Sequence, residues 1–119
     1  MAGAKLLLVM GHTRCGAVNA AVRYACLPES AGQATGCQHL DRVVGDIQKC
    51  IDHEKCQQLL TLPPNQQQAY VDEIARRNVR ASMQSIMQHS NTLRDLVMDG
   101  RLMIAGGMYN VTTGHIDFI

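Results

Sequence analysis

Aromatic residues and long apolar runs are scarce in this sequence. Of its 119 residues, none is Trp and only 3% are aromatic, although 46% are hydrophobic. A core therefore has to be built from Leu, Ile, Val, Met and Ala. The longest apolar stretch is far shorter than the roughly 20 residues that a membrane-spanning helix needs, so we expect no membrane span. Residues 1–5 and the short apolar run behind them also lack the features of a signal peptide.

An excess of one charge is missing as well. Lys and Arg together number 11 and Asp and Glu number 10, which gives a net charge of +1. There is no basic stripe, RNA-reading motif or aromatic ladder, and this argues against nucleic acid as a partner. The five Cys residues are odd in number and their spacings form no disulfide framework. We therefore interpret them as reduced thiols of a cytoplasmic protein.

The length and the pattern of apolar residues predict one α/β domain over residues 1–119, with the order β-α-α-α-α-β-β. Residues 5–10 read "KLLLVM", an unbroken run that is typical of a parallel strand buried on both faces. Residues 101–109 and 115–119 are strand-like, and "NVTTG" between them predicts an antiparallel hairpin. A strand at the very start of the chain with few partners suggests that the chain begins in the middle of a sheet.

Four helices are predicted between these strands. The first covers residues 16–25 and is followed by a Pro-, Gly- and Ser-rich loop over 27–36. The second begins near Leu40 and is stopped by "TLPPN". The third carries its apolar stripe from Val71 to Ile86, with Asn65 as its expected N-cap. The fourth is short and ends at Gly100.

The stretch "GHTRCGAV", residues 11–18, places His12 and Cys15 where the first strand gives way to a helix. Open α/β sheets hold their sites at the carboxyl ends of strands, and the dipole of a helix N-terminus favours a thiolate. A thiolate and a neutral imidazole are good zinc ligands. Gly11 and Gly16 are expected to let the backbone turn tightly around a metal. A tight turn with a buried thiol and a capping histidine is the alternative, and the residues alone leave both open.

A second His-x-x-Cys pair shows how weak the spacing is by itself. His53 and Cys56 lie inside a predicted helix without any chemical context, and we interpret them as part of a solvated helix face. Cys26, Cys37 and Cys50 form no Cys-x-x-Cys motif, and we interpret them as packing or surface residues.

The residues also resemble a known family. "GAKLLLVMGHTRCGAV" resembles the strand and zinc loop of the β-class carbonic anhydrases, and the similarity extends over residues 3–25 and 74–119. The resemblance implies a partial β-carbonic-anhydrase-like layered fold: a short, mostly parallel sheet with a C-terminal antiparallel hairpin, flanked by helices. It also implies a zinc lyase that interconverts carbon dioxide and bicarbonate. His12 and Cys15 would then be zinc ligands, with Gly11 and Gly16 supporting the loop.

One motif of that family is missing. Its members carry Cys-x-Asp-x-Arg on an earlier strand, which supplies a further zinc ligand, and this chain has no such motif. We therefore expect a truncated domain with half of a zinc site, whose other ligands lie upstream of residue 1. No catalytic residue is identified, and the isolated chain is expected to be inactive.

Two other functions stay open at this stage. A non-catalytic binding or assembly module derived from the carbonic anhydrase fold would keep the helices and the hairpin without the chemistry. A redox or nucleophilic role of Cys15 is a weaker possibility, because no base other than His12 lies near it in sequence. The edge of the strand at 5–10 lacks a neighbour, so we expect a homo-oligomer.

Overall fold

The computed structural model describes residues 3–26 and 38–119. The loop predicted over 27–36, and Cys37, lie outside these residues. The chain divides into two compact units. We call Met1–Thr13 with Arg76–Ile119 the sheet unit, and Arg14–Ala75 the helical unit. The single domain predicted from the sequence stays a prediction.

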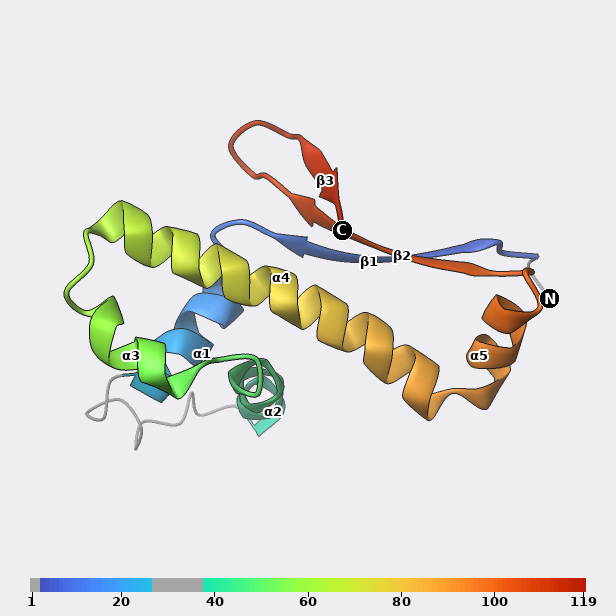
Figure 1. The fold of residues 1–119 in the computed structure, drawn as a ribbon, viewed down its shortest axis with the longest axis horizontal. Coiled ribbons are helices and arrows are strands. Elements are labelled where there is room, and N and C mark those ends of the chain that lie inside the picture. Colours follow the sequence, from blue (N-terminus) through green and yellow to red (C-terminus); the bar gives the residue numbers. More distant parts are fainter. Residues whose placement is uncertain (1–2, 27–37) are drawn as a thin grey trace. The chain divides into compact units, whose positions relative to one another are not determined.

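The sheet unit contains a mixed sheet of three strands in the described residues. These are β1 (Leu6–His12), β2 (Met103–Tyr109) and β3 (Ile116–Phe118), in the order β1-β2-β3. β1 pairs in parallel with β2, and β2 pairs antiparallel with β3 (Figure 1). The predicted parallel strand and C-terminal hairpin are therefore confirmed, although β1 runs two residues further than expected.

The hairpin turn is formed by the predicted "NVTTG" segment. The Asn110 side-chain oxygen accepts hydrogen bonds from the backbone N–H groups of Thr112 and Thr113, at 2.9 and 3.2 Å. Gly114 has a φ of +75°, in the left-handed region that glycine adopts without a steric penalty. The turn residues thus specify this connection locally.

One face of the sheet packs closely against helix α4 (Pro64–His89). A Cβ atom built on Gly106 would lie 2.6 Å from Met83 Sδ and 3.0 Å from Val79 Cγ1. The backbone and the helix can approach this closely only because residue 106 has no side chain. Val9 is the register partner of Gly106, so it lies on the same face.

The opposite face of the sheet is exposed. Leu6, Leu8 and Met10 alternate along β1 and are 56%, 40% and 43% exposed. The prediction that this strand is buried on both faces is therefore wrong. The reason is that, among the described residues, β1 has one strand neighbour and only its other face lies against α4.

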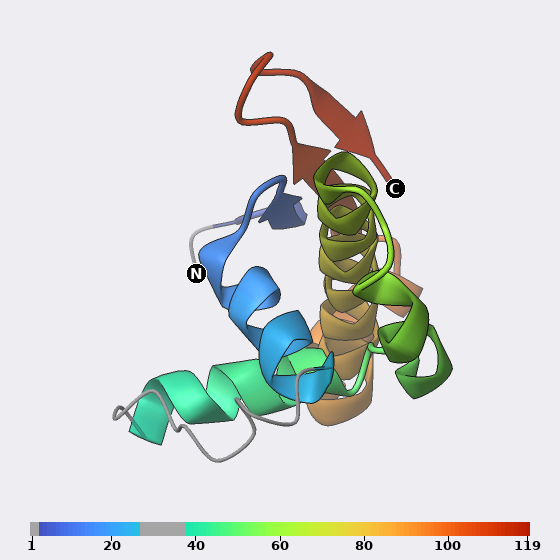
Figure 2. The ribbon, with the colours of Figure 1, turned by 90° about the vertical axis from the view of Figure 1, so that its left-hand side faces the viewer.

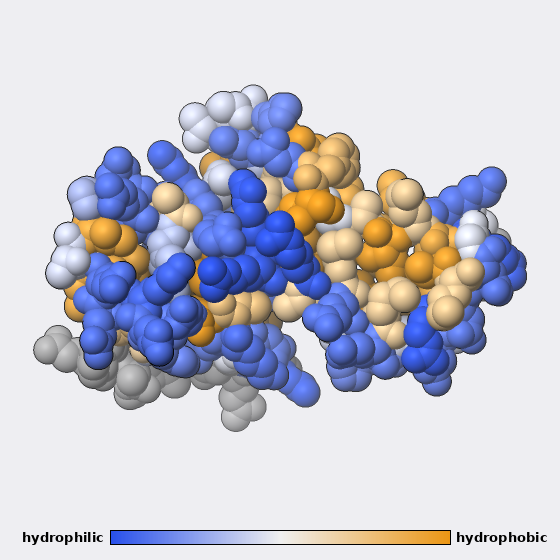
Figure 3. All heavy atoms as spheres, in the orientation of Figure 1, coloured by the Kyte–Doolittle hydropathy of each residue, from blue (hydrophilic) through white to orange (hydrophobic). Residues whose placement is uncertain are grey.

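In the sheet unit a short helix precedes β2, as predicted. Helix α5 (Asn91–Met98) is capped by Ser90, whose hydroxyl accepts the Leu93 N–H, and the chain leaves it through Gly100 with a φ of +72°. A pocket of about 570 Å³ lies between α5 and the start of β1, and Figure 3 shows apolar side chains gathered in this part of the sheet unit. No helix within the described parts of the chain is both long and apolar enough to span a membrane.

The helical unit packs α1 (Gly16–Cys26) against α2 (Gln38–Gln48) and α3 (His53–Leu59), as the blue, teal and green helices of Figure 2 show. Its buried residues are almost all aliphatic, as the lack of aromatic residues predicts. They include Val18, Ala21, Val22, Val44, Ile47, Ile51, Leu59, Val71, Ile74 and Ala75.

The single helix predicted from Leu40 to "TLPPN" is two helices, and this part of the prediction is wrong. α2 ends at Gln48, and α3 begins after Asp52, whose carboxylate accepts the Glu54 N–H. An Asp side chain that bonds to nearby backbone favours a helix start over a helix interior. Described residues therefore form five helices where four were expected.

Asn65 is not the N-cap of α4. That helix begins one residue earlier, at Pro64. Proline suits the first helical position because its missing N–H would have no intrahelical partner there. The carbonyl oxygen of Pro63 accepts the backbone N–H groups of Gln66 and Gln67.

A disulfide joins Cys26, at the end of α1, to Cys56 on α3. Their Cα atoms are 4.8 Å apart, within the usual range for such a bond. The interpretation of all five cysteines as reduced thiols is therefore wrong for this pair, because residues 30 apart in sequence meet through helix packing that no spacing rule reveals. The cytoplasmic location, which rested on reduced thiols, stays a prediction without that support.

Candidate metal centre

His12 is the last residue of β1, where its register partner is Tyr109 at the end of β2. Its side chain is exposed, and its Nδ1 lies 2.9 Å from the carbonyl oxygen of Thr13. A carbonyl oxygen only accepts hydrogen bonds, so this contact favours the tautomer with the proton on Nδ1. Nε2 then keeps its lone pair, as a metal-binding histidine requires.

Thr13 anchors the end of β1 to the hairpin. Its backbone N–H donates to the carbonyl oxygen of Tyr109 at 2.9 Å, and its hydroxyl accepts the Val111 N–H at 3.1 Å. The carbonyl that orients His12 therefore belongs to a residue with fixed backbone. No local sequence signal indicates this role of Thr13, because Val111 lies 98 residues away.

Cys15 directly precedes α1, where its carbonyl oxygen accepts the Asn19 N–H at 2.9 Å. It is thus the N-cap residue of that helix, and its thiol is partly exposed and not part of a disulfide. The predicted position at a helix N-terminus is confirmed. Its role as a metal ligand stays a prediction.

Between the two candidate ligands, the turn is made by Arg14. Its φ of +56° is the one left-handed angle of a non-glycine residue in the described chain. This conformation costs an L-residue about 1 kcal/mol or more, and here a hydrogen bond accompanies it. The Arg14 N–H donates to Asp72 Oδ1 at 3.0 Å, and the Gln68 side-chain amide donates to the same oxygen at 2.9 Å.

Gly11 and Gly16 do not form the tight turn that was expected of them, and their support of a metal site stays a prediction. Gly11 lies within β1, opposite Met108, and Gly16 is the first residue of α1. Neither has a positive φ. The tight turn is made by Arg14 and stabilised by α4, so it needs no glycine.

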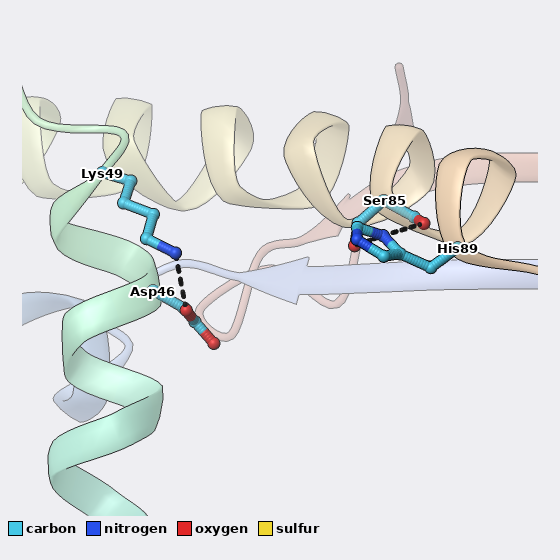
Figure 4. A network of polar contacts seen from close by, with 4 residues as sticks. All are labelled: Asp46, Lys49, Ser85 and His89. Atoms are coloured by element: carbon cyan, nitrogen blue, oxygen red, sulfur yellow. Dashed lines mark hydrogen bonds and ion pairs between the residues drawn. The ribbon is translucent and has the colours of Figure 1, made fainter.

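The other described histidine side chains take part in local contacts or face solvent. His89 Nδ1 lies 2.9 Å from the carbonyl oxygen of Ser85, one helical turn away (Figure 4). His115 pairs with Asp117 at 3.1 Å on the surface, and His53 is exposed on α3. The Asp46–Lys49 ion pair in the same figure is equally local and exposed. Within the side chains that the structure describes, no three His, Cys, Asp or Glu residues are grouped so that they could hold a metal ion.

The two donors fit zinc in kind but not in number. An imidazole with a free Nε2 and a thiol at a helix N-terminus are the donor types that zinc prefers. A catalytic zinc site needs about three protein ligands, and the described residues supply two candidates. His53 and Cys56 cannot add to them as a pair, because the Cys56 sulfur is bonded to Cys26.

Comparisons with solved structures define the fold. A tetrameric β-carbonic anhydrase from Sordaria macrospora superposes with a TM-score of 0.69 at 19% identity, over 97% of this chain and 52% of that one. The three-stranded sheet with its hairpin and helices is therefore part of the β-carbonic anhydrase fold, as the resemblance implied.

Sequence comparisons define the family. A family model described as carbonic anhydrase matches residues 1–116, so the chain belongs to the carbonic anhydrase family. The carbonic anhydrase of Saccharomyces cerevisiae is 26% identical over 115 residues, which are 95% of this chain and 48% of that protein. The carbonic anhydrase of Pseudomonas aeruginosa is 28% identical over 111 residues, 93% of this chain and 44% of that protein. The chain thus spans about half the length of these relatives.

Proposed function

We propose that this chain carries half of the zinc site of a carbonic anhydrase that acts on carbon dioxide and bicarbonate. His12 Nε2 and Cys15 Sγ are the proposed ligands, and Gly11 and Gly16 flank the loop that holds them. The supporting observation is a free thiol at the start of α1, three residues after a histidine whose tautomer suits metal binding. Membership of the carbonic anhydrase family supports zinc, rather than another metal, as the ion for this donor pair.

The chain's own residues restrain each of the two proposed ligands separately. Thr13 orients the His12 ring through its carbonyl oxygen, and α1 fixes the backbone of Cys15. Bound zinc supplies a Lewis acid that activates water toward carbon dioxide. With two donors where a catalytic site needs about three, this chain alone binds zinc weakly and does not catalyse hydration.

Metal analysis and a stopped-flow assay of carbon dioxide hydration test this proposal together. The purified chain is loaded with zinc and assayed beside its His12→Ala variant. We expect weak, His12-dependent zinc binding and a hydration rate indistinguishable from that of buffer. Hydration at enzymatic rates that His12→Ala abolishes would contradict the proposed inactivity, and zinc binding that His12→Ala does not change would contradict the ligand assignment.

A second function, as a non-catalytic assembly module, is favoured by the exposed face of the sheet. Met103 on β2 and Phe118 on β3 are 64% and 73% exposed, and they continue the apolar surface of Leu6, Leu8 and Met10. β1 is also an edge strand of the described sheet. An apolar edge strand is a template for pairing with another chain, so we propose a homo-oligomer, most simply a two-fold dimer.

A charged residue on this face tests the oligomer. Leu8→Glu should convert the assembly to monomers in size-exclusion chromatography with light scattering. Met98→Glu is the matched control, because Met98 is 76% exposed but lies on α5 and not on a strand of the sheet. A wild-type chain that stays monomeric at high concentration would rule out the oligomer.

The cytoplasmic location is tested separately, by cell fractionation.

A further inference from the structure

We infer that Asp72 is a positioning residue for the thiol of Cys15, and that it acts through the backbone of Arg14. The inference rests on the proposed zinc site and adds to it a residue of α4 that does not itself contact the metal. Asp72 lies 58 residues from Arg14 in sequence, and both belong to the helical unit.

Asp72 provides the acceptor for the N–H group of the turn. Its Oδ1 accepts the Arg14 N–H at 3.0 Å and the Gln68 side-chain amide at 2.9 Å. The carboxylate is half-buried, and Gln68 lies one turn before it on the same helix. Gln68 thereby orients the oxygen that accepts the Arg14 N–H.

The left-handed conformation of Arg14 determines where the next residue points. For a residue with a Cβ atom, the right-handed and extended regions are lower in energy than a φ of +56°. Without an acceptor at Asp72, Arg14 can leave the left-handed region. Cys15 would then enter α1 from a different direction, although its own carbonyl oxygen still bonds to Asn19.

Metal affinity is sensitive to this change because the Cys15 thiol can bind a metal only when it points in the right direction. If only a fraction of chains holds the Cys15 thiol in the competent direction, the apparent dissociation constant rises by the inverse of that fraction. Removing a partner that orients a ligand typically weakens metal affinity about 10- to 100-fold. We expect a loss at the lower end of this range for Asp72→Ala, since α1 still restrains Cys15.

A titration with Co²⁺ measures the effect through the thiolate-to-cobalt absorption band, which requires a bound sulfur. Asp72→Ala should weaken Co²⁺ binding about tenfold. Asp72→Asn keeps an oxygen acceptor and should restore binding to within about twofold. The double variant Asp72→Ala with Arg14→Gly should recover part of the loss, because glycine adopts positive φ readily. Asp46→Ala, which removes an exposed carboxylate on α2, is the control and should change nothing.

Hydrogen exchange of the Arg14 amide gives a readout that needs no metal. Asp72→Ala should speed this exchange at least tenfold, and Asp72→Asn should not. A wild-type cobalt band that Asp72→Ala leaves unchanged would overturn the inference and leave the zinc site intact. The absence of any band that depends on Cys15 would overturn the zinc site and, with it, the metal role of Asp72. Unchanged exchange in Asp72→Ala would show that Asp72 does not hold the loop at all.

Discussion

His12 and Cys15 lie at the junction of a strand and a helix, whereas His53 and Cys56 lie within one helix, although both pairs share the spacing His-x-x-Cys. In the first pair the thiol is free and the histidine ring is oriented by the next carbonyl. In the second pair the sulfur is bonded to Cys26 and the histidine faces solvent. The comparison teaches that two donors at metal-binding spacing become a candidate site only where the backbone presents them and the thiol has no covalent partner.

The largest effect is expected on stability, from removing the disulfide between Cys56 and Cys26. Cys56→Ser opens a loop whose ends are 30 residues apart, and the chain-entropy estimate for that length is about 3–4 kcal/mol in the free energy of unfolding. Urea unfolding without reductant measures it, with Cys15→Ser as the control that should stay within about 1 kcal/mol of the wild type. Equal stability of Cys56→Ser and the wild type would mean that this disulfide does not form in solution.

Metal affinity, unlike stability, should depend on the first pair and not on the second. Cys15→Ser should weaken Co²⁺ binding at least about 100-fold, since a ligand is lost and not merely an orienting group. The double variant Cys26→Ser with Cys56→Ser removes the second pair's sulfur without leaving a new thiol, and its affinity should equal that of the wild type. Equal losses of Co²⁺ affinity in both variants would mean that the position of Cys15 between a strand and a helix does not matter for metal binding.

The smallest effect concerns the helix that carries the second pair. Asp52→Ala removes the N-cap of α3 and should lower the free energy of unfolding by about 1 kcal/mol, with no change in Co²⁺ affinity. Asp46→Ala removes an exposed carboxylate that pairs only with Lys49 and should cost less than about 0.5 kcal/mol. Thermal or urea unfolding of both variants tests whether the loss of stability comes from the missing N-cap and not from the missing charge.

Much of the fold follows from local sequence signals. The apolar run of β1, the hairpin turn at Asn110 to Gly114 and the end of α5 at Gly100 each depend on residues close in sequence, and each prediction is confirmed. The break between α2 and α3 was missed because Asp52 acts as a cap in the middle of an otherwise helical apolar pattern. The exposed face of β1 was missed because burial depends on neighbours that the strand's own residues do not determine.

The candidate site was predictable only in its ligand types. His12 and Cys15 stand out by their position between a strand and a helix, and the family resemblance gives them a role. Thr13 and Asp72 could not be predicted, since their partners lie 98 and 58 residues away and meet the loop only in the folded chain. The Cys26–Cys56 bond was missed for the same reason.

The contact between Gly106 and α4 has a consequence for how this sequence can vary over time. Gly114 is restricted by its own backbone angle, so a residue that tolerates positive φ, such as Asn, is an acceptable replacement there. Gly106 has no such angle and is restricted by Met83 and Val79 instead. A side chain at position 106 therefore requires the flexible Met83 side chain to move and Val79 to give way, so we expect substitutions at these three positions on a strand and a helix to be coupled.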